Sequence, residues 1–281
     1  MKNQMSRVLI WMCGVAVGSN VALPRGQAQR MQYPFAATMA ENGVVFVADS
    51  HAPAIWAFEN GELEKYFEAS KDYRTPLNRP QCLALDPDGN LLVGDSATRE
   101  VYRFDDAGNP VPLTDGKIGI PRAIVVMPGG DLMVTDRELH CIWKVPADGG
   151  VPERFAAVQG VIGMCGDDDG NLWVTSGRKP KLRKITPDGE TNAVVTDGPF
   201  QFPQEVAIDD SNTVFVADNY AKTIWKISPG RKPVPWVEGD PLVSPIGVTW
   251  TGDKLIVTDP HAKAVFQVDD SGTVTQLVPA G

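Results

Sequence analysis

Two of the three histidines in this 281-residue chain occupy equivalent places in a repeated pattern. His51 and His261 each lie two residues after an aspartate that ends an apolar run, and Tyr220 has the same place in another copy. Neighbouring imidazole and phenol groups could ligate a metal ion or transfer protons. Two loops of related sequence, S-H-A-P-A and P-H-A-K-A, could equally carry two surface histidines that share no chemical role.

Four polar side chains stand at positions that are small or apolar in most other copies of this pattern. Gln81, Arg122, Gln204 and Glu205 each occupy one of the two positions that follow a recurring proline. A buried arginine or glutamate needs a partner, because an isolated charge is costly to remove from water. Two interpretations stay open: a ligand-binding set, or a structural Arg122–Glu205 ion pair.

An aspartate ends the apolar run in five of the six copies, and a serine ends it in the fourth copy. These six residues, referred to below as the anchors, are Asp49, Asp95, Asp136, Ser176, Asp218 and Asp259. A ring of carboxylates could bind a cation. Because the same residue type recurs in nearly every copy, the pattern instead favours a structural role, in which each anchor accepts hydrogen bonds from backbone N–H groups of its own loop.

The anchors recur at intervals of 46, 41, 40, 42 and 41 residues, and particular residue types recur at constant distances from them. Residues that tolerate a positive φ stand six positions before the anchors: Gly43, Gly89, Gly130, Gly170, Asn212 and Asp253. Another glycine follows 12 or 13 positions after each anchor. The 27 glycines and 23 prolines of the chain therefore indicate many short elements joined by tight turns.

Each copy has room for four short strands, and a four-stranded repeat of about forty residues is the size of a propeller blade. In the second copy we expect strands at Gln81–Asp86, Leu91–Asp95, Glu100–Phe104 and Pro110–Thr114. The predicted fold is an all-β, six-bladed β-propeller with four antiparallel strands per blade, over residues 29–281. The expected blades are about 34–79, 80–120, 121–160, 161–202, 203–244 and 245–281.

The chain direction within a blade decides which candidate residues share a face. The first strand starts on the same side of the ring as the loop that follows the anchor. Copies five, six and one become neighbours when the ring closes, so we expect Tyr220, His261 and His51 on one face with Glu205. Loops on one face of a rigid scaffold are a common place for a binding site.

The recurring motif P-x-x-(apolar)-x-(apolar)-D-x-x-G-x-(apolar)-x-V-A/T-D, followed by I-W-K-I, resembles the NHL repeat in all six copies. The segment GMCGDDDGNLWV at residues 163–174 also resembles the senescence marker protein/gluconolactonase family. Both groups contain six-bladed propellers. The second resemblance implies a divalent metal, Ca²⁺ or Zn²⁺, and Glu205 and Asp218 are the residues of this chain that would hold it. The glutamate that opens the first repeat in that family is absent here, where Pro34–Ala36 stands.

Charge and the N-terminal residues bear on partners and location. The net charge of −9 disfavours binding to nucleic acid, whose phosphates an acidic surface repels. Lys2 and Arg7, followed by the short apolar run Val8–Gly18, predict a signal peptide at residues 1–28 and an exported, periplasmic or extracellular protein. That run is too short for a stable membrane span. Three cysteines without C-x-x-C spacing remain after residue 28, so no disulfide framework is expected.

Two functions from different classes fit these observations. The first is a monomeric binding module that presents its first-strand and loop face to a small molecule or a protein, through Gln81, Arg122, Gln204, Glu205 and the His51, Tyr220 and His261 group. The second is a metal-dependent lactone or ester hydrolase that resembles gluconolactonase. The basic run at residues 178–184 could dock an anion or form a solvated strand edge.

Overall fold

Every regular element in the described part of the chain is a β-strand. The structure, a computed structural model, describes residues 30–70, 72 and 75–278, and the predicted signal peptide at residues 1–28 lies outside them. The strands of the first three blades are β1 (Pro34–Met39), β2 (Val45–Asp49), β3 (Ala54–Glu59), β4 (Glu62–Glu68), β5 (Pro80–Leu85), β6 (Leu91–Asp95), β7 (Glu100–Phe104), β8 (Pro110–Pro112), β9 (Pro121–Val126), β10 (Leu132–Asp136), β11 (Cys141–Val145) and β12 (Glu153–Ala157). Those of the last three are β13 (Val161–Gly166), β14 (Leu172–Ser176), β15 (Leu182–Ile185), β16 (Thr191–Val195), β17 (Pro203–Ile208), β18 (Val214–Asp218), β19 (Thr223–Ile227), β20 (Val234–Glu238), β21 (Gly247–Trp250), β22 (Leu255–Asp259), β23 (Ala264–Val268) and β24 (Val274–Val278).

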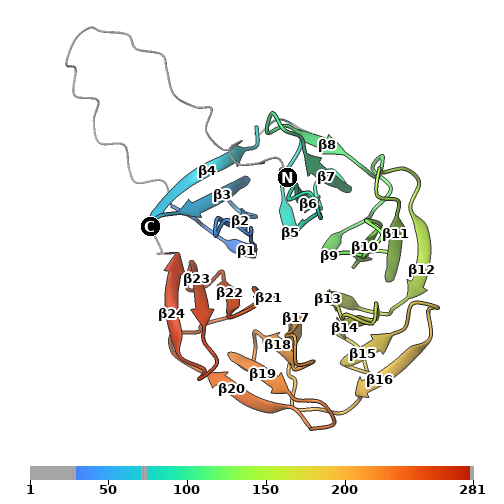
Figure 1. Cartoon of the computed structure of the whole chain (residues 1–281), viewed down its shortest axis with the longest axis vertical. Helices are drawn as coiled ribbons and strands as arrows, with labels where there is room; N and C mark the ends of the chain where they lie inside the picture. The colour runs from blue at the N-terminus through green and yellow to red at the C-terminus, as the bar shows by residue number, and fades with distance from the viewer. Residues whose placement is uncertain (1–29, 71, 73–74, 279–281) are drawn as a thin grey trace, which may run out of the picture. The chain divides into compact units, whose positions relative to one another are not determined.

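The strands form six four-stranded antiparallel sheets, each built from four consecutive strands. Figure 1 shows these sheets as blades around a centre, with the first strand of each blade innermost and the fourth at the rim. The predicted six-bladed β-propeller is confirmed. Among the described residues there is no helix with the length and apolarity that a membrane crossing requires.

Burial along the strands follows their place in the blade. The second strand packs between neighbouring blades, so β6, β10, β18 and β22 are buried on both faces. The fourth strand lies at the edge of the sheet, and β4 alternates exposed and half-buried residues. The apolar core therefore consists of clusters between adjacent blades; one of them joins Leu92 and Val101 of the second blade to Ile124 and Leu132 of the third.

The ends of two strands in the second blade differ from those predicted. Asp86, predicted to end the first strand, instead closes the turn, where its carboxylate accepts the N–H groups of Asp88 at 3.0 Å and Asn90 at 2.8 Å. Thr114, predicted to end the fourth strand, lies beyond β8 because its backbone N–H donates to the buried carboxylate of Glu100 at 2.6 Å. In both places a side-chain acceptor replaces a ladder hydrogen bond.

The hairpin between the first and second strands turns on a residue with positive φ in every blade. Gly89 has φ +83° and Asn212 has φ +60°, at the positions predicted for them. The sixth blade differs, because Gly252 at φ +94° takes this conformation and the predicted Asp253 does not. Glycine adopts a positive φ at little cost, so the turn forms one residue earlier where a glycine is present.

The anchors hold the loops together, as their repetition predicted. All five anchor aspartates are fully buried. Asp136 is representative: its carboxylate accepts the backbone N–H groups of Gly119, Ile120, Glu138 and Leu139 and the indole N–H of Trp143, at 2.7–3.1 Å. Each anchor thereby ties the segment before its blade to the loop after its own strand.

Within residues 30–278 as far as they are described, the first and sixth blades meet without exchanging a strand. The hydroxyl groups of Thr258 and Thr249 donate to the carbonyl oxygens of Phe35 at 3.0 Å and Ala37 at 2.8 Å. Apolar side chains from both blades pack alongside these bonds, including Val47, Trp56, Ile256 and Val265. Side-chain hydrogen bonds and a shared apolar cluster therefore close the ring.

Candidate functional site

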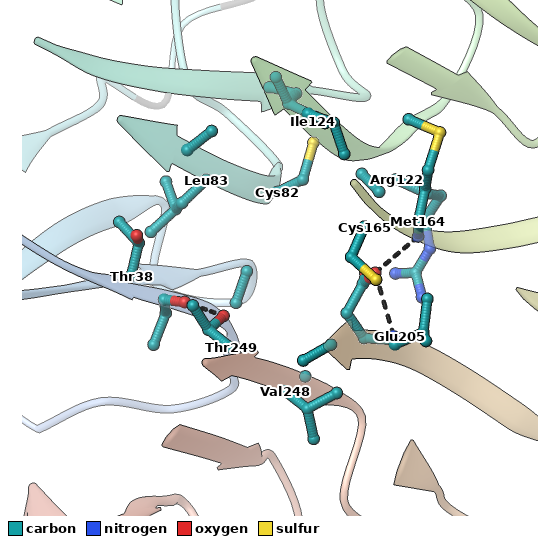
Figure 2. A pocket seen from close by; sticks show the side chains of 18 of the residues that line it. Thr38, Cys82, Leu83, Arg122, Ile124, Met164, Cys165, Glu205, Val248 and Thr249 are labelled. Carbon is teal, nitrogen blue, oxygen red and sulfur yellow. Dashed lines mark hydrogen bonds between the residues drawn. The ribbon is translucent and has the colours of Figure 1, made fainter. Parts of the chain in front are cut away.

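A cavity of about 430 Å³ runs through the centre of the ring. The innermost strands of the blades line it, from Arg122 and Glu205 near the strand starts to Met39, Leu85 and Trp250 at the strand ends. Figure 2 shows residues that line it, with the charged side chains of Arg122 and Glu205 together on one side and the hydroxyl groups of Thr38 and Thr249 away from them.

Arg122 bridges several blades at the polar end of the cavity. Its side chain is buried, with 5% exposure. The NH1 group donates to Oε1 of Gln81 at 3.4 Å, and the NH2 group donates to Oε1 of Gln204 at 3.1 Å. The guanidinium carbon lies 4.3 Å from the ring centroid of Phe35. Residues from β1, β5, β9 and β17 thus meet around one cation.

The two glutamines are oriented by equivalent loop residues. The amide nitrogen of Gln81 donates to Oγ of Ser96 at 3.1 Å, and that of Gln204 donates to Oδ1 of Asn219 at 3.4 Å. Ser96 and Asn219 each follow an anchor directly. Because their amide N–H groups are taken by these loops, both glutamines turn their oxygens toward Arg122.

Glu205 stands beside Arg122 and is partly exposed to the cavity. Its Oε1 accepts the backbone N–H of Met164 at 2.7 Å and that of Val206 at 3.3 Å. Burial raises the pKa of this carboxyl group to about 7, although the Met164 N–H and the positive charge of Arg122 both lower it. A carboxyl group with this pKa can hold or release a proton near neutral pH.

The backbone around Glu205 leaves room for no side chain at residue 163. A Cβ atom on Gly163 would lie 2.6 Å from both Cα and Oε1 of Glu205. The Thr175 hydroxyl accepts the Gly163 N–H at 2.9 Å and donates to the Gln204 carbonyl oxygen, which fixes this approach between the fourth and fifth blades. The absence of a side chain here lets the Glu205 carboxyl group reach Met164.

Four of the residues predicted from the sequence therefore meet: Gln81, Arg122, Gln204 and Glu205. The structural Arg122–Glu205 ion pair, one of the two interpretations, does not form. No nitrogen of Arg122 lies within 4.0 Å of a carboxylate oxygen among the described residues. The two groups attract each other through space while each binds other partners.

The predicted group of His51, Tyr220 and His261 is brought together only in part. His51 stacks on Tyr33 with ring centroids 4.2 Å apart, and His261 meets the same tyrosine edge-on at 6.1 Å. Tyr220 stacks instead on Phe202, at 5.2 Å, and is 70% exposed. Tyr33 thus stands between the two histidines, at the seam of the first and sixth blades.

The residues implied for a divalent metal do not form a site. Asp218 is an anchor whose carboxylate accepts the N–H groups of Gln201 at 2.7 Å, Phe202 at 2.9 Å and Ala221 at 3.2 Å. Glu205 has a separate set of partners in the channel. Within residues 30–70, 72 and 75–278, no three His, Cys, Asp or Glu side chains are placed to hold a metal ion together. Glu205 and Asp218 therefore do not share a carboxylate, imidazole or thiolate cluster that could hold the metal implied by the resemblance.

The basic run at residues 178–184 is largely engaged within its own blade. Lys184 lies 3.0 Å from the carboxylate of Asp167 and over the ring of Trp173, and Lys179 pairs with Asp197. Arg183 is buried, and its NH2 group donates to the Pro180 carbonyl oxygen at 3.1 Å. These contacts favour the structural interpretation of the run.

Sequence reasoning missed the roles of Phe35 and Tyr33. Tyr33 comes just before the first strand and Phe35 lies at its start. Neither the repeat nor a motif distinguishes these two residues from aromatic residues of the core. Cys82 and Cys165, expected to be buried apolar residues, line the cavity. Both thiols are free, and burial raises the pKa of Cys82 to about 12 and that of Cys165 well above its usual value.

The class of protein is a six-bladed β-propeller with polar groups gathered in its central channel. Residues 22–216 match the SMP-30/gluconolactonase/LRE-like region, so the chain belongs to this family. The predicted resemblance to the senescence marker protein/gluconolactonase family is confirmed. No curated protein sequence matches the chain.

Solved structures with low sequence identity share the fold. Virginiamycin B lyase from Staphylococcus aureus has a TM-score of 0.68 and 17% identity, with 89% of this chain and 85% of that chain covered. A gluconolactonase from Xanthomonas campestris has a TM-score of 0.71 and 12% identity, with 88% of each chain covered. A chain of the nidogen/laminin complex has a TM-score of 0.71 and 19% identity, with 84% and 93% covered. At these identities the likeness shows the fold alone, and the fold is shared by enzymes and binding proteins.

Proposed function

We propose that this protein is a binding module that holds a small organic acid in its central channel, with the carboxylate on Arg122. The supporting observation is the buried guanidinium. Its NH1 and NH2 groups contact amide oxygens, and its Nε has no hydrogen-bond partner among the described residues. A carboxylate accepts parallel hydrogen bonds from a guanidinium and supplies the opposite charge that a buried cation needs. The cavity volume favours a small molecule over a folded protein partner.

The proposal is tested with isocaproate and its uncharged analogue isocaproamide. We expect isocaproate to raise the melting temperature of the protein in a concentration-dependent manner, because a ligand that binds only the folded state stabilises it. Isocaproamide should have little effect. Arg122→Gln should remove the response to isocaproate, and Arg122→Lys should weaken it, because lysine keeps the charge and loses the planar fork.

Glu62→Gln is the matched control, because Glu62 is an exposed residue of β4 at the rim of the ring. This variant should respond to isocaproate as the unmodified protein does. Equal responses to the acid and the amide, or no response to the acid at tens of millimolar, would overturn the proposal. If Arg122→Gln does not fold, Arg122→Lys replaces it in the test. A smaller rise in melting temperature with isocaproate than in the unmodified protein supports the proposal, and an equal rise overturns it.

Family membership supports a second candidate, a metal-dependent lactone or ester hydrolase. Because the described residues contain no cluster of three His, Cys, Asp or Glu side chains, other groups would have to hold its metal. Elemental analysis of the purified protein, together with melting curves in Ca²⁺ and Zn²⁺, separates the two candidates. A stoichiometric metal that is lost in a His51→Ala/Glu205→Ala double variant would replace the binding module with the hydrolase.

We also propose that the protein acts as an exported monomer. The basic start and the apolar run Val8–Gly18 support export, and the acidic net charge supports a soluble monomer. N-terminal sequencing of the protein recovered from outside the cytoplasm and light scattering of the purified protein test these two points. An uncleaved N-terminus, or a mass of two chains or more, would contradict them.

A further inference from the structure

The polar end of the channel holds two opposite charges that do not pair with each other. Arg122 contributes a buried guanidinium, and Glu205 contributes a carboxyl group that faces the cavity. Oε1 of Glu205 accepts two backbone N–H groups, whereas its Oε2 accepts no hydrogen bond from the described residues. Oε2 of Glu205 therefore has capacity for one more partner, and Arg122 has more N–H groups than the two that bind the glutamine oxygens.

The rest of the channel wall combines apolar side chains with the hydroxyl groups of Thr38 and Thr249 and the thiols of Cys82 and Cys165. Leu83 of β5, Ile124 of β9 and Val248 of β21 line the cavity from three blades, and Ile124 and Val248 also pack in the apolar clusters between blades. The cavity of about 430 Å³ is within the range of pockets that enclose small organic molecules. A ligand that fits this site would have a charged head at Arg122 and Glu205 and an apolar body along the walls.

We propose that the channel recognises an α-amino acid with an apolar side chain, whose carboxylate binds Arg122 and whose ammonium group binds Glu205. This inference rests on the proposed function and adds the class of acid. An α-amino acid carries both charges on adjacent atoms, so it can neutralise a cation and an anion that stand side by side without touching. A simple carboxylic acid would neutralise only Arg122 and leave Glu205 without a counter-charge.

The proposed contact makes binding dependent on pH in a defined direction. Burial raises the pKa of Glu205 to about 7, so the free protein holds a proton there at mildly acidic pH. The other titratable groups that face this carboxyl group are Arg122 of β9 and the thiols of Cys82 and Cys165, which burial keeps neutral. An ammonium group needs an ionised Glu205. Affinity for an amino acid should therefore rise as the pH increases from about 6 to about 8, with release of a proton on binding.

The test compares L-leucine with isocaproate, which lacks the amino group, and with isoamylamine, which lacks the carboxylate. Isothermal titration calorimetry at about pH 6 and about pH 8, in two buffers of different ionisation enthalpy, measures affinity and proton release. The release should be largest at about pH 6, where Glu205 of the free protein is protonated. We expect L-leucine to bind roughly tenfold more tightly than isocaproate at about pH 8, the effect of one charge-assisted hydrogen bond. Isoamylamine should bind weakly, because it offers nothing to Arg122.

Variants separate this inference from the proposed function. Glu205→Gln should bind L-leucine and isocaproate with similar affinity and without proton release, whereas Glu62→Gln should keep the difference between them. Equal binding of L-leucine and isocaproate by the unmodified protein would overturn the amino-acid assignment and leave the acid-binding function in place. Failure of both acids to bind, or unchanged binding of both by Arg122→Gln, would overturn the proposed function itself.

Discussion

Replacement of Glu205 by glutamine should change how the stability of the protein depends on pH. Burial raises the pKa of Glu205 from 4.5 to about 7, against the opposing effects of the Met164 N–H and Arg122. Below pH 4.5 the carboxyl group is protonated in the folded and the unfolded chain, so it does not destabilise the fold. Between pH 4.5 and about 7 the unfolded chain loses this proton first, and the folded state becomes relatively less stable. Above about pH 7 the loss is complete.

The size of the effect follows from the difference between the two pKa values, which corresponds to at most ~3 kcal/mol. Water in the channel reaches the partly exposed carboxyl group and reduces this figure. Glutamine has the same shape, can still accept the Met164 N–H and does not ionise. For a chain of this size, ~1 kcal/mol moves the melting temperature by roughly 2–4 °C. Glu205→Gln should therefore gain roughly 5–10 °C relative to the unmodified protein between about pH 4.5 and about pH 8.

Circular dichroism melts of the unmodified protein, Glu205→Gln and Glu62→Gln across this pH range measure the effect. Only the difference between each variant and the unmodified protein is compared, because the titration of all other groups then cancels. Glu62→Gln should show a difference that does not change with pH. A difference for Glu205→Gln that stays constant with pH would contradict the raised pKa, since it would mean that Glu205 titrates alike in the folded and unfolded chains.

Three further substitutions test the fold around the site. Asp136→Ala removes a buried carboxylate that accepts five hydrogen bonds and should lower the free energy of unfolding by about 3 kcal/mol or more in urea. Asp210→Ala, at an exposed position, should change it by less than about 0.5 kcal/mol. Similar losses in the two variants would argue against the anchor role. Gly163→Ala places a Cβ atom 2.6 Å from Cα of Glu205 and should lower the melting temperature clearly, whereas the Cβ of Gly177→Ala meets nothing closer than 3.8 Å and should be tolerated. Burial alone would raise the pKa of Asp167, but hydrogen bonds from Trp173, Lys184 and Asn171 lower it to about 2, so its contribution to stability is present above pH 3.8 and is lost as the pH falls toward 2. Asp167→Asn should flatten that part of an acid titration followed by circular dichroism, and an unchanged acid limb would contradict the assignment.

Much of the fold could be predicted because each blade repeats the same local requirements. Gly89 and Asn212 mark their turns through a backbone conformation that few residues adopt readily. The anchors mark the ends of the second strands because a buried aspartate needs nearby N–H donors. The sixth blade shows the limit of such reasoning: Asp253 could have taken the turn, but the neighbouring Gly252 does.

The candidate site could be predicted only in part. Gln81, Arg122, Gln204 and Glu205 stood out because they are polar where most copies are apolar, and they do meet in the channel. The pairing among them could not be deduced, because composition does not say whether Arg122 reaches Glu205 or the two glutamine oxygens. Tyr220 was grouped with the histidines from its equivalent position, yet its exposed ring stacks on Phe202, the residue just before β17.

The number of blades, the strands within them and the anchors can be predicted from the repeat, since they depend on contacts between residues close together in the chain. The contacts inside the channel, in contrast, depend on how the blades are assembled. The Arg122–Gln204 bond joins residues 82 positions apart, and the Met164–Glu205 bond joins residues 41 positions apart. Such contacts depend on the curvature of the closed ring and on which side chain arrives within hydrogen-bond distance, and no local pattern encodes either one.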